Sequence, residues 1–213
     1  DKMIICFDLD GTLVDTEKWI VSALKESFKL NKKKVPTKKQ IFKEWGKSAR
    51  VLIKAIDPAL KKEEIESIRK DFYEVRKQTK SMITPFPNTK QTLRKLSKNY
   101  KLAILSNNSH KIILEILNIT KIDKKLFSIV VGDDEVKRAK PFPDEIYKAE
   151  NKFKKKVNFM IGDTVQDIKT AKAANVKSII IKQGPKETWK NLNKANFIIR
   201  NISELPELIK EAQ

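Results

Sequence analysis

Several features are scarce in this sequence, and each shortage excludes a class of protein. The only cysteine among 213 residues is Cys6, so no disulfide can form within the chain, and we expect a reducing, cytoplasmic compartment. No apolar run approaches the ~20 residues that a membrane-spanning helix requires. The apolar stretch of DKMIICF is too short for a signal peptide and has no small-residue cleavage site. We therefore expect a globular protein without a membrane partner.

Arginine is also scarce, although the chain is strongly basic. Lysine and arginine number 46 against 27 acidic residues, a net charge of +19, yet arginine stands only at positions 50, 69, 76, 94, 138 and 200. The lysines are scattered and aromatic residues do not alternate with them, so the arginine forks and stacking platforms of nucleic-acid readout are not visible. We favour a lysine-rich solvated surface, which would also concentrate anionic substrates near a cleft. A nucleic-acid-binding protein on a retired enzyme scaffold stays as the rival.

Short apolar runs alternate with helical patterns along most of the chain. The runs of strand length cover residues 3–7, 101–106, 127–132, 157–162, 177–182 and 196–200. Patterns typical of helices lie between the later runs, at 110–117, 143–153, 164–175 and 186–195. Such alternation predicts an α/β fold with a doubly wound, mostly parallel, Rossmann-like sheet.

Residues 16–82 interrupt this alternation with a pattern that is helical throughout. Ile65, Ile68, Phe72 and Val75 are spaced three or four apart, as on the buried stripe of one helix. We expect helices at about 17–30, 37–45, 48–56 and 61–81. The pattern therefore predicts a helical cap domain, 16–82, inserted after the first strand into an α/β core domain of residues 1–15 and 83–213.

Short polar side chains follow four of the predicted strands. They are Asp8 and Asp10, Ser106 and Asn107, Lys140, and Asp163 with Asp167. In an open parallel sheet the carboxyl ends of the strands border the ligand-binding crevice. Each group alone has an ordinary explanation, such as a helix cap for Asp15 or for the aspartate of IGDTVQD. Together they indicate a site, in which a cation or a shared proton must offset the repulsion between Asp8 and Asp10.

The chain resembles the haloacid dehalogenase superfamily of phosphotransferases, whose four motifs have counterparts, in order, in FDLDGTLVDT, ILSNNS, AKPFPD and IGDTVQD. Residues 16–82 look like the small helical cap of the branch that contains phosphoglycolate phosphatase and β-phosphoglucomutase. The departures are Ala139 and Asn88, which stand where glycine is common in this branch and concern loop geometry. The resemblance implies a phosphatase that hydrolyses small phosphomonoesters, such as phosphoglycolate or a sugar phosphate, through an aspartyl phosphate.

The resemblance also implies a role for each polar residue. Asp8 would be the nucleophile, because a carboxylate is ionised at neutral pH and leaves readily from an acyl phosphate. Asp10 would protonate the leaving oxygen and later activate water, and Lys140 would bridge nucleophile and phosphate.

A Mg²⁺ ion would neutralise the phosphoryl charge. Its implied ligands are Asp8, the backbone carbonyl of Asp10, Asp163 and, directly or through water, Asp167. The implied phosphate-binding residues are Gly11, Thr12, Ser106 and Asn107.

The predicted cap contains a loop, EWGKSARVL (44–52), that resembles the loop leaning over the site in this branch. Gly46, Lys47 and Arg50 are candidates for contact with an anionic leaving group, or else Lys47 and Arg50 cover a solvated helix face. Phosphoglycolate, pyrophosphate and sugar phosphates stay open as substrates. We expect a monomer or a weak dimer.

Rival functions fit the residues to different degrees. A phosphomutase of the β-phosphoglucomutase type would use the same residues, and the GTL after Asp10 leans only weakly toward hydrolysis. A dehalogenase is disfavoured, because halide displacement needs no acid such as Asp10. A calcium-binding loop would need an oxygen ligand at position 12 followed by glycine, whereas Thr12 is followed by Leu13. The lone histidine, His110, is expected to begin a helix and has no assigned role.

Overall fold

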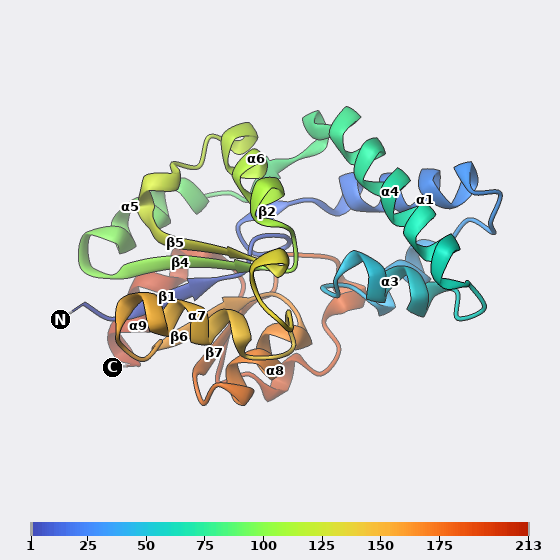
Figure 1. Ribbon diagram of the computed structural model, residues 1–213. Coiled ribbons are helices and arrows are strands. Elements are labelled where there is room, and N and C mark those ends of the chain that lie inside the picture. The colour runs from blue at the N-terminus through green and yellow to red at the C-terminus, as the bar shows by residue number, and fades with distance from the viewer. Residues whose placement is uncertain (1, 213) are drawn as a thin grey trace.

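A six-stranded parallel sheet forms the centre of the protein, in a computed structural model that describes residues 2–212 (Figure 1). The strands lie in the order β5-β4-β1-β6-β7-β8, and every neighbouring pair is parallel. They are β1 (Ile4–Phe7), β4 (Lys101–Ser106), β5 (Phe127–Gly132), β6 (Phe159–Gly162), β7 (Lys177–Ile181) and β8 (Phe197–Ile199). Each strand falls within a predicted apolar run, and the predicted α/β class is confirmed.

Helices cover both faces of this sheet because the central strands are apolar on both sides. Ile5 and Phe7 of β1 belong to one buried cluster, whereas Ile4 and Cys6 belong to another on the opposite face. The first cluster includes residues of α5 (Thr89–Asn99), α6 (His110–Thr120) and α9 (Leu205–Glu211). The second includes residues of α7 (Asp144–Phe153) and α8 (Val165–Ala173). His110 begins α6, as predicted.

The strand order places a topological switch point beside β1. After β1 the chain adds β4 and β5 on one side, then crosses back to add β6, β7 and β8 on the other. Phe7, the last residue of β1, pairs with Ile104 of β4 and with Ile161 of β6. Ligands bind at such a point, outside the carboxyl ends of the strands.

The helical segment between β1 and the rest of the sheet has a hydrophobic core of its own. It consists of α1 (Glu17–Leu30), α2 (Lys38–Lys43), α3 (Ala49–Ile56) and α4 (Lys62–Gln78). Leu24, Phe28, Ile53, Ile68 and Phe72 are buried together in this core. The four predicted helices are confirmed, and Figure 1 shows them beside the strand ends that carry the polar motifs.

A pair of very short strands, which the sequence did not suggest, closes the base of this helical segment. Val14–Asp15 (β2) pairs antiparallel with Thr84–Pro85 (β3), where the chain leaves the sheet and returns to it. Just beyond, Asp15 Oδ1 accepts a hydrogen bond of 3.1 Å from the backbone N–H of Glu17. The cap position of α1 is Thr16, whose side chain makes no capping bond, so Asp15 supplies the acceptor from one residue earlier.

The helix predicted over 186–195 is wrong. This segment forms two separate 3₁₀ turns, Lys186–Thr188 and Leu192–Lys194, interrupted by Asn191, which has a left-handed φ of 60°. Leu192 is buried against Ile168 and Ile180. A long helical stretch is therefore replaced by turns that place one apolar side chain, Leu192, against the core.

Within residues 2–212, no helix combines the length and apolar character needed to cross a bilayer.

Candidate active site

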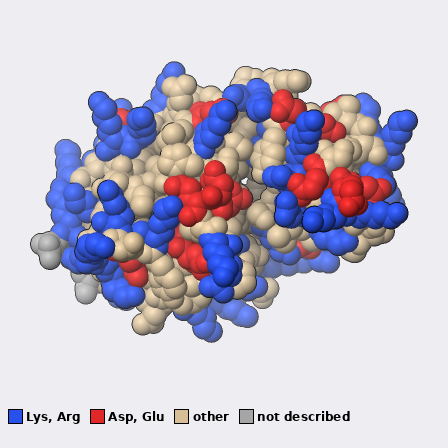
Figure 2. All heavy atoms as spheres, viewed as in Figure 1, with Lys and Arg blue, Asp and Glu red and all other residues tan. Residues whose placement is uncertain are grey.

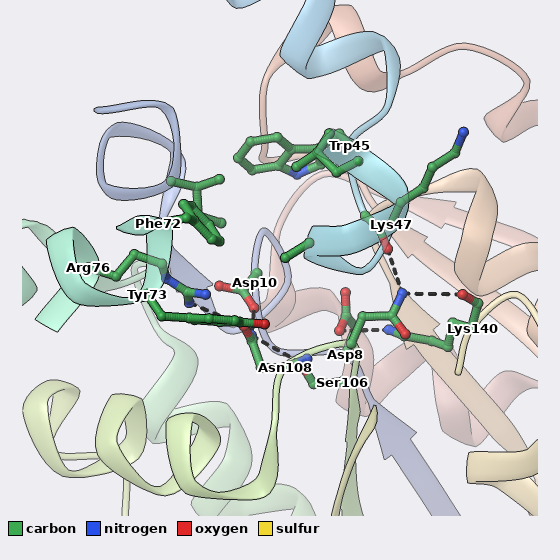
Figure 3. Close-up of a pocket in the computed structure, with 15 residues that line it drawn as sticks. Asp8, Asp10, Trp45, Lys47, Phe72, Tyr73, Arg76, Ser106, Asn108 and Lys140 are labelled. Carbon is green, nitrogen blue, oxygen red and sulfur yellow. Dashed lines mark hydrogen bonds and ion pairs between the residues drawn. The ribbon is translucent and has the colours of Figure 1, made fainter. Parts of the chain in front are cut away.

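The predicted polar residues meet where β1, β4 and β6 end. Asp8 directly follows β1, and its backbone N–H donates to the carbonyl oxygen of Ile161 in β6 at 2.8 Å. Ser106 is the last residue of β4, and Asp163 follows β6. Lys140 lies in the connection between β5 and α7 and points back toward Asp8 (Figure 3). Groups that are far apart in sequence thus share one edge of the sheet.

Lys140 joins two of the carboxylates through a buried ammonium group. Its Nζ lies 2.7 Å from Asp8 Oδ1 and 2.8 Å from Asp167 Oδ1, and the Lys140 side chain is 2% exposed. Burial alone would lower the pKa of Lys140, but the carboxylates of Asp167 and Asp8 outweigh burial and raise this pKa above its ordinary value. Lys140 therefore stays charged and holds the Asp8 carboxylate in one orientation.

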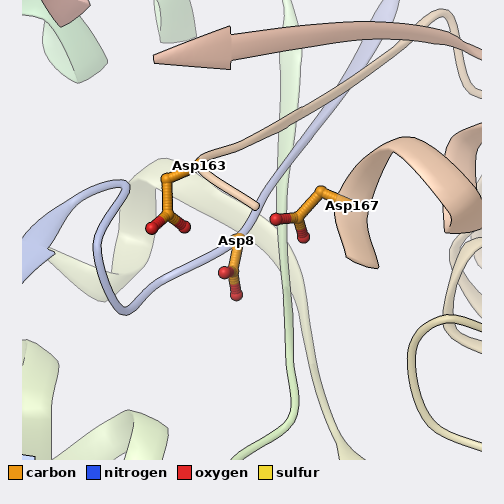
Figure 4. A group of neighbouring side chains, drawn as sticks. All are labelled: Asp8, Asp163 and Asp167. Atoms are coloured by element: carbon orange, nitrogen blue, oxygen red, sulfur yellow. The ribbon is translucent and has the colours of Figure 1, made fainter. Parts of the chain in front are cut away.

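Three buried carboxylates form an acidic cluster around the end of β1. Asp8, Asp163 and Asp167 each offer an oxygen, and these oxygens lie within 4.8 Å of one another (Figure 4). Burial, with repulsion from Asp167 and Asp10, raises the pKa of Asp8 to about 7 despite Lys140. Burial, with repulsion from Asp8 and Asp167, also raises the pKa of Asp163. A divalent cation would relieve this repulsion.

The donor set fits a hard divalent cation. Carboxylate oxygens are the ligands that Mg²⁺ and Ca²⁺ take in proteins. Asp163 Oδ2 is buried and has no hydrogen-bond partner among the described residues, so a ligand oxygen is available. Asp167 is more fully engaged: Oδ1 contacts Lys140, while Oδ2 accepts from the N–H and hydroxyl of Thr164 at 3.1 and 2.9 Å.

Gly11 is required by the close approach of the first motif to Asp163. Its φ is +79°, and a Cβ at this position would lie 2.1 Å from Asp163 Oδ2. Left-handed backbone without a side chain is what glycine permits. The next residue, Thr12, donates from Oγ1 to Asp163 Oδ1 at 3.1 Å, and its carbonyl accepts a bond from Gln183. The turn after β1 is therefore fixed against the acidic cluster.

Asp10 lies on the other side of Asp8, against a residue that the sequence did not single out. Asn108 Nδ2 donates to Asp10 Oδ2, whereas Asp10 Oδ1 is buried without a partner among residues 2–212. Ser106 Oγ accepts from the backbone N–H and from Nδ2 of Asn108, at 3.2 Å each. The available signal was the polar run SNNS (106–109) at the end of a strand, but the run does not say which of its two asparagines turns inward.

A cavity of about 60 Å³ separates these residues from the helical segment. Its lining includes Trp45, Gly46, Tyr73 and Arg76 from the helical side (Figure 3). Gly46 has a φ of +84°, and a Cβ there would lie 2.9 Å from Thr164 Oγ1. Its carbonyl accepts from Asn107 Nδ2 at 2.7 Å, so the loop is docked onto the sheet.

The two basic residues expected to contact the leaving group from this loop are both held by glutamates. Lys47 lines the cavity but is ion-paired with Glu44. Arg50 is 61% exposed, lies 2.7 Å from Glu66 and is absent from the cavity lining. Sequence reasoning missed Arg76, which is 4% exposed and lines the cavity. The signal was an arginine at a buried position of α4, four residues after Phe72.

The Asp8 carboxylate is fixed beside the buried ammonium group of Lys140 and next to further carboxylates that could hold a metal. Such a carboxylate is suited to attack on a phosphoryl group, because the charge of that group must be neutralised. The fold and site thus define an α/β enzyme of phosphate chemistry. Residues 5–181 match the family described as haloacid dehalogenase-like hydrolase, and the chain belongs to this family.

Two relatives illustrate the activities carried by similar chains. Pyrophosphatase PpaX of Halalkalibacterium halodurans is 25% identical, over 96% of this chain and 95% of its own length. A phosphoglycolate phosphatase of Aquifex aeolicus is 30% identical, over 83% of each chain. Family and relatives together make this protein a phosphatase, of a family that uses divalent metal ions.

Solved structures share the whole fold. The haloacid dehalogenase-like family protein SP0104 from Streptococcus pneumoniae superposes with a TM-score of 0.83 at 24% identity, covering 100% of this chain and 99% of that one. CbbY from Rhodobacter sphaeroides, solved in complex with phosphate, gives a TM-score of 0.83 at 18% identity, covering 96% of each chain. At these identities the likeness concerns the fold.

Proposed function

We propose that the protein is a Mg²⁺-dependent phosphatase that hydrolyses small phosphomonoesters or pyrophosphate through a phosphorylated Asp8. The observation that carries this proposal is the contact of 2.7 Å between Lys140 Nζ and Asp8 Oδ1, next to the cavity. Lys140 orients the Asp8 carboxylate and would also neutralise an incoming phosphoryl group. We further propose that residues 16–82 act as a cap domain that closes over the core of residues 1–15 and 83–213.

The reaction would proceed in two steps. An Asp8 oxygen forms a bond to phosphorus while the ester bond breaks, and Asp10 gives its proton to the leaving oxygen. A water molecule then attacks the aspartyl phosphate, Asp10 takes a proton from it, and the bond between Asp8 and phosphorus breaks to release inorganic phosphate. The chain therefore returns to its starting protonation state.

Asp8, Asp163 and the backbone carbonyl of Asp10 would hold the cation, with Asp167 as a further or water-mediated ligand. When bound, Mg²⁺ would supply positive charge that offsets the charge of the phosphoryl oxygens. Ser106 would bind a phosphoryl oxygen, because its hydroxyl accepts from Asn108 and its own proton has no acceptor among the described residues. Gly11, Thr12 and Asn107 would supply further contacts to the phosphoryl group; of these, Asn107 lines the cavity.

The lining of the cavity favours an anionic leaving group. Arg76 lies on its helical wall, where a guanidinium can face a carboxylate or phosphate. The names of the relatives, phosphoglycolate phosphatase and pyrophosphatase, are consistent with such substrates. Mutase activity on a sugar phosphate is the less favoured alternative, because these relatives carry the names of hydrolases.

The test is phosphate release from phosphoglycolate, pyrophosphate and glucose phosphates, with Mg²⁺ and with chelator. We expect release that needs Mg²⁺, is highest for the first two substrates and is lost by at least about 10⁴-fold in Asp8→Asn, which removes the nucleophile. Independently of activity, Mg²⁺ should raise the melting temperature of the wild type and not that of Asp163→Asn. Full activity in Asp8→Asn, or salt-sensitive oligonucleotide binding without phosphatase activity, would contradict the proposal.

A further inference from the structure

Arg76 and Asn108 form a hydrogen-bonded chain that runs from the helical segment to Asp10. Arg76 Nη2 donates to Asn108 Oδ1 at 3.1 Å, and Asn108 Nδ2 donates to Asp10 Oδ2. Figure 3 shows the three side chains converging at the cavity wall. Neither Arg76 nor Asn108 has a part in the two steps derived above.

The chemistry of arginine decides which way the Asn108 amide faces. A guanidinium has five N–H donors and no acceptor, so the atom of Asn108 that faces Arg76 must be the carbonyl oxygen. The amide nitrogen is thereby turned toward Asp10 and Ser106 Oγ. An amide assignment normally depends on its hydrogen-bond network, and here Arg76 leaves one choice.

This orientation also distinguishes the two oxygens of Asp10. Oδ2 accepts a hydrogen bond from the side-chain N–H of Asn108, so Oδ2 cannot donate in that direction. Oδ1 is buried and has no partner among the described residues. Asn108 thus fixes the Asp10 carboxyl group through Oδ2 and leaves Oδ1 without a bond inside the described part of the chain.

We propose that Asn108 and Arg76 are positioning residues that hold the Asp10 carboxyl group in one orientation, with Oδ2 bonded to Asn108 and Oδ1 unbonded, an inference that rests on the proposed role of Asp10 as the acid. Arg76 is itself firmly held in the helical segment. Its guanidinium carbon lies 3.9 Å from the centroid of the Trp19 ring, and Trp19 Nε1 donates to the Arg76 carbonyl at 2.9 Å. Asp10 is therefore oriented by α4, and only while α4 is seated over the sheet.

The experiment compares two substrates that differ in their need for an acid. An alkyl phosphate leaves as a basic alkoxide and needs the proton of Asp10, whereas p-nitrophenyl phosphate leaves as a stable anion and needs it little. We expect Asn108→Ala and Arg76→Met to lower kcat for the alkyl phosphate by about 100-fold and for p-nitrophenyl phosphate by less than about 5-fold. Arg76→Lys, which keeps a cationic donor, should restore part of the loss. Arg69→Met serves as the control, because Arg69 lies on the same helix, pairs with Glu66 and does not line the cavity.

Activity on p-nitrophenyl phosphate also reports whether each variant is folded. An equal fall for both substrates in Asn108→Ala and Arg76→Met, or no fall for either, would overturn the positioning role while the proposed phosphatase function stands. If the wild type releases no phosphate from either substrate, the proposed function fails, and this inference fails with it.

Discussion

Glu145 is a buried carboxyl group that the proposed reaction does not use. It is 0% exposed, and burial, with repulsion from Asp8 and Asp167, raises its pKa to about 8 although Lys140 opposes the shift. Because the pKa in the folded protein lies above the ordinary value, the folded state holds this proton more tightly than the unfolded chain. The contribution of Glu145 to stability is therefore present at low pH and is lost as the pH rises toward and through about 8.

Glu145→Gln should remove this dependence, since glutamine resembles the protonated acid in shape and never ionises. We expect the variant to match the wild type near pH ~5 and to exceed its free energy of unfolding by about 2 kcal/mol above pH ~8. Urea unfolding at both pH values measures the difference. Glu74→Gln, at an exposed pair with Lys77, is the control and should show little change. A constant difference across the pH range would show that Glu145 has the same pKa in the folded and unfolded protein, so that burial does not shift it.

The positions of residues at strand ends could be predicted from the sequence, because the apolar runs show where the strands end. Asp8, Ser106 and Asp163 each follow an apolar run, so their common edge of the sheet follows from the parallel topology. Arg76 and Asn108 could not be placed this way. Their position depends on how α4 is seated over the sheet and on which of two adjacent asparagines turns inward, and both are set by tertiary packing.

The loop between α2 and α3 is one of the elements that dock the helical segment onto the sheet. Gly46→Ala would strain a left-handed backbone by about 1–2 kcal/mol and bring a methyl group against Thr164. We expect the chain to fold but kcat/KM for phosphomonoesters to fall about tenfold, because the loop would lose its contact with Asn107. Steady-state kinetics and circular dichroism together test this. Ser48→Ala, whose side chain makes no capping bond, should leave both unchanged; equal losses in the two variants would argue against docking by Gly46.

The accuracy of element prediction depended on length and periodicity. The six strands and the four helices of residues 17–78 show clear apolar patterns, and their positions were predicted within a few residues. The β2–β3 pair was not, because two-residue strands carry no periodicity. The helix expected at 186–195 failed because Asn191 adopts a left-handed conformation, which short polar side chains tolerate and which ends helical hydrogen bonding.

At the scale of the whole molecule, the net charge of +19 coexists with a locally acidic site. Figure 2 shows lysine and arginine spread over the visible face, with acidic side chains gathered in a few patches. The positive charge would attract small anions to the whole surface, and the residues of the site would then bind them. Lysines beside the hollow that shares Trp45 with the cavity should then contribute more to association than lysines elsewhere.

Two triple variants separate these contributions. Lys39, Lys43 and Lys190 are exposed beside the hollow between α2 and residues 186–191, next to Trp45 and Thr164. Changing these three to Gln should raise KM for phosphoglycolate several-fold and flatten its increase with NaCl, with kcat unchanged, because screening acts on association over roughly 10 Å. The matched control changes Lys95, Lys98 and Lys101, which are exposed around the start of β4 at the opposite edge of the sheet, and should leave KM and its salt dependence as in the wild type. If both triples have the same effect, the charge acts through the whole molecule; if KM does not depend on salt in any of them, the lysines only solvate the surface.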